Sequence, residues 1–186
     1  AMIVALMLHR PFKGRALVRT FFVFPWIVPS FVVGILWGFM WQRETGIINI
    51  LLYDFLHVGR YFSLLHITKF IEKPFWLIGD FMTFIAIVIP TVWRGWPLSM
   101  LLLLAGLQNI SQEYYEAAEI DGANGWQKFW NITFPLLKPV WAILLLFGLI
   151  FNVYSFNIVY MMFGNGAGFP GDWGDLMMTN IFRNAF

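Results

Sequence analysis

Acidic side chains are concentrated at one place in this sequence. Four of the ten acidic residues lie between positions 113 and 121, namely Glu113, Glu116, Glu119 and Asp121. Carboxylates can act in general acid–base catalysis when a pair of them, or a carboxylate and a histidine, flank a reacting group. No acidic residue or histidine, however, falls within the long apolar segments 21–41, 81–107 and 139–163. We therefore interpret the acidic cluster as a docking element for a partner rather than as an active site, with a merely solvated loop as the alternative.

Metal and cofactor chemistry finds little support in the residue types. His57 and His66 are nine positions apart, and the chain has no cysteine to complete a zinc site. The glycine-rich stretch 164–175 lacks the following Lys-Ser/Thr of a phosphate-binding loop. The sequence therefore predicts no metal, no cofactor and, at a net charge of +2, no nucleic-acid partner.

Five polar residues within the apolar segments are candidates to line a substrate pathway: Arg94, Asn152, Tyr154, Ser155 and Asn157. An arginine inside a membrane is costly, so Arg94 either faces a cavity or reaches with its long side chain to the interface. Amides and hydroxyls inside a membrane commonly join helices to one another. The four other residues are therefore explained either by helix packing or by a hydroxyl-rich ligand such as a sugar.

These side chains must be positioned by membrane helices. The chain is 60% hydrophobic and only 12% charged, whereas soluble domains are about one quarter charged. Segments 21–41, 81–107 and 139–163 are each long enough to cross a bilayer, which takes about 20 apolar residues. The sequence thus predicts an all-α, polytopic membrane helical bundle. Pro25 and Pro29 should kink the first span.

Two further features of the sequence concern helix packing and the ends of the chain. Gly34 and Gly38 form a GxxxG pair that permits close helix approach. Residues 1–8 and 176–186 are typical of the last and first turns of two further helices. We interpret the chain as part of a longer membrane protein, without the first and last helices of that protein, with a short natural protein as the alternative.

The polar passage 111–135 has the residues of a capped helix followed by a turn. Ser111 can cap a helix, and Gly122 can supply the left-handed conformation that ends it. Glu119 and Asp121 then lie at the carboxyl end, where the helix dipole disfavours negative charge. A basic surface on a partner would explain their presence there.

Basic residues suggest the orientation of the chain. The loop before the first span carries Arg10, Lys13, Arg15 and Arg19, and such positive loops usually lie in the cytoplasm. The range 42–80 on the other side also carries four basic residues. Orientation therefore depends on the density of charge and on the family resemblance that follows.

The passage resembles the coupling loop of ABC-importer permeases, which carries the EAA motif. That pattern is Glu-Ala-Ala, three residues, Gly, nine residues, Ile, one residue, Leu-Pro. Phe134 replaces the leucine of the pattern. AGLQNISQEYYEAAEIDGA and FWNITFPLLKPV are similar to the carbohydrate branch, the maltose and glycerol-3-phosphate permease type. The matching residues are Glu116, Ala117, Ala118, Asp121, Gly122, Ala123, Ile132 and Pro135.

The resemblance implies a type I ABC-importer transmembrane domain over 1–186, without catalytic residues of its own. It implies a multi-pass subunit of the bacterial or archaeal cytoplasmic membrane, surrounded by lipid, with the coupling loop in the cytoplasm. The expected partners are a second permease, two cytoplasmic ATPase subunits that hydrolyse ATP, and an extracytoplasmic solute-binding protein. A small sugar is the expected cargo.

Two other functions stay open at the level of sequence. A type I permease for another solute, such as a polyamine or phosphate, would share the coupling loop. A secondary transporter would run on an ion gradient, but the long apolar segments lack the carboxylate that such a mechanism often uses.

Overall fold

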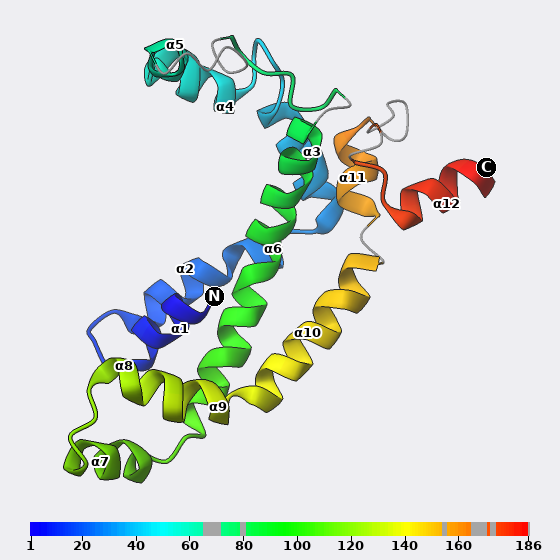
Figure 1. The fold of residues 1–186 in the computed structure, drawn as a ribbon. Helices are drawn as coiled ribbons and strands as arrows, with labels where there is room; N and C mark the ends of the chain where they lie inside the picture. Colours follow the sequence, from blue (N-terminus) through cyan, green and yellow to red (C-terminus); the bar gives the residue numbers. More distant parts are fainter. Residues whose placement is uncertain (65–71, 79–80, 154–155, 165–170, 172–173, 186) are drawn as a thin grey trace. The chain divides into compact units, whose positions relative to one another are not determined.

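The computed structural model describes residues 1–64, 72–78, 81–153, 156–164, 171 and 174–185. Over these residues all regular structure is helical, and it includes two π-helical segments, η1 and η3 (Figure 1). The elements in chain order are α1 Met2–His9, α2 Arg15–Ile27, α3 Ser30–Met40, α4 Ile47–Asn49, η1 Ile50–Phe55, α5 Val58–Leu64, α6 Phe81–Gln108, α7 Gln112–Ile120, α8 Gly125–Lys128, η3 Phe129–Thr133, α9 Phe134–Leu136, α10 Lys138–Val153, α11 Asn157–Met162 and α12 Met177–Ala185.

The chain forms two compact units, each with its own core. Unit 1 comprises Ala1–Ile27 and Gly95–Asn152, and unit 2 comprises Val28–Arg94 and Val153–Phe186. The long helix α6 contributes its first half to unit 2 and its second half to unit 1.

The core of unit 1 forms along one face of α6. Met100, Leu103, Leu104 and Leu107 recur at the spacing of a single helical face and are buried. Leu137, just before α10, and the α1 residues Ala5 and Leu8 complete this cluster. Apolar periodicity in the sequence thus becomes the contact surface on which α1 and α10 pack.

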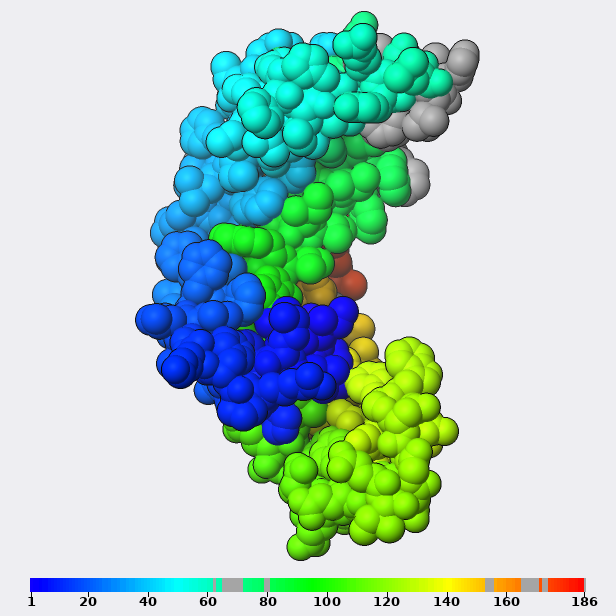
Figure 2. All heavy atoms as spheres, turned by 90° about the vertical axis from the view of Figure 1, so that its left-hand side faces the viewer, coloured from blue at the N-terminus to red at the C-terminus, as the bar shows by residue number. Residues whose placement is uncertain are grey.

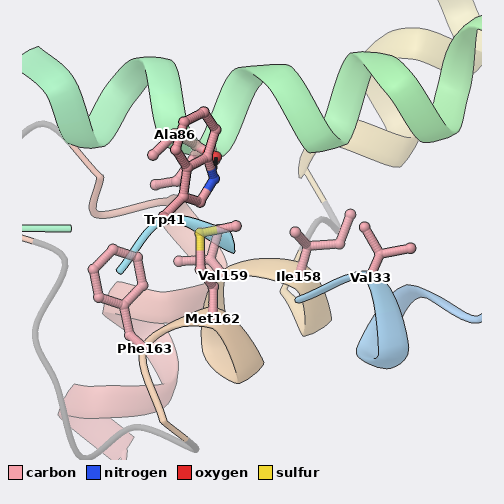
Figure 3. Packing of buried hydrophobic residues seen from close by; sticks show 8 residues of the cluster. Val33, Trp41, Ala86, Ile158, Val159, Met162 and Phe163 are labelled. Carbon is pink, nitrogen blue, oxygen red and sulfur yellow. Dashed lines mark hydrogen bonds between the residues drawn. The ribbon is translucent and has the colours of Figure 1, made fainter. Parts of the chain in front are cut away.

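The core of unit 2 joins α3, α6 and α11. The cluster contains Val33, Trp41, Ala86, Ile87, Ile158, Val159, Met162 and Phe163 (Figure 3). Trp41 donates its indole N–H to the Ala86 carbonyl at 3.1 Å, which satisfies a polar group inside this apolar cluster.

The GxxxG pair packs α3 against α11, which confirms the predicted close helix approach and adds the identity of the partner helix. A β-carbon on Gly34 would lie 2.5 Å from the Ile158 carbonyl oxygen, and one on Gly38 would lie 3.0 Å from that of Met162. Only glycine allows the two backbones to approach this closely.

Proline breaks the range 21–41 into two helices. Pro25 lies inside α2, whereas Pro29 precedes α3 as its N-cap. A proline cannot donate a backbone hydrogen bond, and it disfavours a helical conformation in the residue before it. The chain therefore leaves the helix at Val28, immediately before Pro29, while Pro25 is accommodated within α2.

Length and apolar composition identify one helix of the described residues, α6, that can cross a membrane. The number rises to as many as three if each of two bent pairs of helices counts as one span. One pair is α2 with α3, and the other is Gly125–Leu136 with Lys138–Asn152, which is bent by 61°. The range 139–163 is divided between α10 and α11. Exposed large apolar side chains, among them Leu145 and Leu149, cover α10, as expected of a helix that meets lipid or other helices.

A polar network holds the start of α12. The Asp175 carboxylate accepts hydrogen bonds from Thr179, Asn180 and Arg183, each at 2.8 Å. Burial by itself raises the pKa of Asp175. The hydrogen bonds from Asn180 and Thr179 and the Arg183 guanidinium outweigh this effect and hold the pKa below its ordinary value.

Candidate functional site

Helix α7, which carries the Glu-Ala-Ala residues, is fixed at both ends by local hydrogen bonds. The Ser111 hydroxyl accepts from the Glu113 N–H at 3.4 Å, so the sequence prediction of an N-cap is confirmed. Gly122 has φ +77°, which confirms the predicted left-handed turn. The N–H of Ala123 donates to the Ala118 carbonyl at 2.8 Å, and that of Gly122 to Glu119 at 3.0 Å. This is the Schellman arrangement, which satisfies the carbonyls at the helix end.

The site has two arms, α7 and the segment 124–135 that follows it, and the second arm begins with a capping box. The Asn124 side chain accepts from the Gln127 N–H at 2.9 Å, and the Gln127 side chain accepts from the Asn124 N–H at 2.8 Å. The chain continues through α8 into the π-helix η3, which contains Ile132, and then into α9 with Pro135. π-helical turns are rare and are frequently found at functional sites.

Two side-chain contacts tie the arms together. The hydroxyls of Tyr115 on α7 and Thr133 on η3 are 2.9 Å apart, and Thr133 is buried. Lys128 on α8 donates to the Glu119 carboxylate at 2.6 Å. Sequence reasoning missed Tyr115, Thr133 and Lys128 because positions 18 and 9 residues apart carry no local spacing signal. Glu119 therefore has a basic partner within the chain, and the expectation of a basic surface on another protein stays a prediction.

The outer surface of α7 and α8 combines carboxylates with exposed apolar side chains. Glu116 and Asp121 are exposed. Ile120 and Trp126 are 88% and 71% exposed, and Tyr114 is also exposed. Figure 1 shows α7 beyond α8 and α9 at one end of unit 1. Exposed apolar groups rimmed by charge are typical of a contact surface for another protein.

A row of aromatic rings connects this surface to α10. Trp126 contacts Trp130 at a centroid distance of 5.7 Å, and Trp130 contacts Phe134 at 5.1 Å. Phe134 in turn contacts Trp141 on α10 at 5.8 Å. Rings at these separations attract one another and pack as rigid units. The rings therefore form a continuous row of contacts from α8 to α10.

The described candidates for the substrate pathway have partners within their own units. Arg94 donates its Nε–H to the Val28 carbonyl at 3.3 Å, beside the break between α2 and α3. Asn157 on α11 donates to the Ser30 hydroxyl of α3 at 3.4 Å.

Asn152 donates to the Gly148 carbonyl of its own helix at 2.6 Å. Tyr154 and Ser155 lie outside the described residues. The Asn157 bond, which joins α11 to α3, supports the packing interpretation for that residue, and contact with cargo stays a prediction for all of the candidates.

Unit 2 also contains an open pocket of about 530 Å³ around α5. Its lining includes Arg43, Tyr53, His57, Arg60 and Lys73. Burial raises the pKa of Tyr53. Within the described residues no group of three potential metal ligands comes together, and His66 lies outside them.

Comparison with known proteins places this geometry in a family. The profile of the family described as binding-protein-dependent transport system inner membrane component matches residues 1–185. The trehalose/maltose transport system permease protein MalF of Thermococcus litoralis is 38% identical over 164 residues, covering 88% of this chain and 51% of that protein. The maltodextrin transport system permease protein MalC of Streptococcus pneumoniae serotype 4 is 34% identical over 183 residues, covering 96% of this chain and 41% of that protein.

A solved structure shares the fold. It is that of a bacterial ABC transporter involved in the import of the acidic polysaccharide alginate. The match has a TM-score of 0.67 and 21% identity, and covers all of this chain and 60% of the other. The chain spans about half the length of the curated relatives it matches. The helical architecture is that of an ABC-importer permease, and the chain belongs to the family of inner membrane components of binding-protein-dependent transport systems.

Proposed function

We propose that the chain belongs to the transmembrane domain of a permease subunit in an ATP-driven importer. The observation that carries this proposal is the clamped helix α7, which presents Glu116 and Asp121 beside exposed Ile120. The names of the relatives mention trehalose, maltose and maltodextrin. We therefore infer a sugar or sugar derivative as the cargo.

Coupling of ATP hydrolysis to transport follows from the rigid connection between α7 and the segment 124–135. A helix closed at both ends and tied to its neighbour by Tyr115–Thr133 and Lys128–Glu119 moves as one body. An ATPase subunit that receives α7 in a cleft would push this body when its dimer closes. The aromatic row from Trp126 to Trp141 would then carry the displacement to α10.

The same assignment defines the partners and the orientation. ATP hydrolysis belongs to two cytoplasmic ATPase subunits, and α7 lies on their side of the membrane. A second permease completes the pathway, and an extracytoplasmic binding protein delivers the cargo. In this chain α7 supplies force transmission and no catalytic group.

The proposal is tested by separating ATP hydrolysis from uptake in the assembled transporter. Glu116→Gln removes one charge from the exposed face of α7, and Gly122→Ala forces a β-carbon into a left-handed turn at a cost of about 1–2 kcal/mol. We expect both variants to insert and assemble, and to lose binding-protein-dependent uptake relative to ATP hydrolysis. Glu113→Gln, which removes the same charge from the other end of the helix, should keep the two coupled. Normal uptake by both variants would show that α7 does not couple.

A further inference from the structure

The segment formed by α4 and η1 has an exposed apolar face. Large apolar side chains with fractional exposures between 42% and 76% recur along it, namely Ile47, Ile50, Leu51 and Phe55. Three of them are spaced four residues apart, and Ile50 and Phe55 are five apart, which is the spacing of a π-helical turn. The four side chains therefore share one face, which we call the η1 stripe. Figure 2 shows this cyan segment at the surface that faces the viewer.

The other side of the same segment is attached to unit 2. Ile48 packs against the core cluster of that unit, and Asn49 is fully buried. The Asn49 amide donates to the Arg43 carbonyl at 3.0 Å and to the Pro74 carbonyl at 3.3 Å. Its side-chain oxygen accepts the indole N–H of Trp76 at 2.8 Å. These bonds satisfy the buried amide and fix the rotation of the segment, so the η1 stripe faces away from the core.

The attachment holds the segment where α3 ends and α6 begins. Trp41 follows α3 directly, Trp76 precedes α6, and their ring centroids are 4.6 Å apart. Tryptophan is enriched where membrane helices reach the membrane–water interface. In the view of Figure 1 the segment from α4 to α5 runs across the direction of α6. A helix that crosses the direction of a membrane helix at this level lies along the membrane surface.

Charged side chains near the segment are separate from the η1 stripe. Residues 45–53 contain no charged residue. Lys73 pairs with Asp54 at 2.8 Å, and Arg43 pairs with Glu72 at 3.4 Å. Three of these residues line the open pocket around α5, whereas none of the four stripe residues does. Separation of an apolar face from a charged side is typical of a helix that lies in the membrane interface.

We propose that α4 and η1 form an interfacial helix whose η1 stripe lies in the lipid at the membrane surface. The apolar side chains then leave water, which is favourable, while the ion pairs and the pocket stay in contact with water. A protein partner would also cover the stripe, but it would not explain its place beside the paired tryptophans at the start of α6. Lipid therefore fits more of the observations. The proposal requires only that α3 and α6 cross the membrane, and it is independent of the cargo and of the ATPase.

The experiment measures how deep the η1 stripe lies in a bilayer. The full-length permease, in a cysteine-free assembled transporter, is reconstituted into vesicles of phosphatidylethanolamine and phosphatidylglycerol. Nitroxide labels at Leu51→Cys and Phe55→Cys report collisions with oxygen, which enters lipid, and with a nickel chelate, which stays in water. We expect both labels to lie about 5–10 Å into the boundary between headgroups and acyl chains, where oxygen collisions dominate. A control label at Ser63→Cys, an exposed residue of the pocket lining, should collide mainly with the nickel chelate.

A charge placed on the stripe provides a second arm. Leu51→Asp should move the label at Phe55→Cys toward water and raise its collisions with nickel, whereas Leu51→Met should leave its depth unchanged. Leu51 is exposed, so neither change disturbs the core. Equal nickel access at Phe55→Cys and Ser63→Cys, or a depth that Leu51→Asp does not alter, would overturn the proposal. Protection of the stripe labels from both oxygen and nickel would also overturn it, because a protein would then be the occupant.

Discussion

The contact between α3 and α11 allows a sharp test of the packing in unit 2. In Gly34→Ala the new β-carbon would lie 2.5 Å from the Ile158 carbonyl oxygen and 2.8 Å from the Met161 β-carbon. The first of these is a backbone atom, so relief requires moving α11 away from α3. That movement would open the cluster that includes Val33 and Val159. Overpacking of this kind usually costs about 1–3 kcal/mol.

Other glycines provide matched controls for the same substitution. Gly106→Ala would meet side-chain atoms, those of Leu137 and Val140, at 2.7 and 2.8 Å, and these shift at lower cost than the backbone oxygen that Gly34→Ala would meet. Gly148 on α10 has no atom within 4 Å of the position that a methyl group would occupy, and alanine at an open helical position is favoured over glycine by about 0.5–1 kcal/mol. The expected order of stability is therefore Gly148→Ala, then Gly106→Ala, then Gly34→Ala.

The assay is thermal or denaturant unfolding of the full-length permease in mild detergent, followed by tryptophan fluorescence. Trp41 lies within the core of unit 2 and should report the loss of packing. Gly34→Ala with the stability of the wild type would refute the close contact. An equal loss for Gly148→Ala would show that the effect comes from glycine replacement in general.

Two further predictions concern polar contacts. Lys128→Glu should loosen α7 because it places like charges together, and the added change Glu119→Lys should restore the ion pair. Hydrogen exchange in α7 measures both effects. We expect a change of about 0.2–1 kcal/mol because the pair is partly exposed. The lowered pKa of Asp175 means that its network stabilises the fold at pH values above the ordinary carboxyl pKa and loses this contribution as the pH falls through the lowered value. Asp175→Asn should remove that acid sensitivity of α12 in a pH series of hydrogen exchange, and an unchanged pH profile would contradict the assignment.

Local signals in the sequence determined the ends and the close approaches of several helices. Ser111 and Gly122 act through bonds to residues a few positions away, so their roles follow from residue type and neighbouring sequence. Gly34 and Gly38 indicated a tight helix contact by their spacing of four residues, but not that α11 is the partner. The apolar segments likewise predicted helices because their composition permits little else in a membrane.

Only the tertiary structure decided which helices and side chains meet. No spacing rule joins Tyr115 to Thr133 or Arg94 to Val28, because their proximity depends on how the chain returns on itself. The same limit applies to the ion pair of Glu119 with Lys128. The sequence revealed a charge that the helix dipole disfavours, whereas only the fold could show that the cation beside it comes from α8 of the same chain.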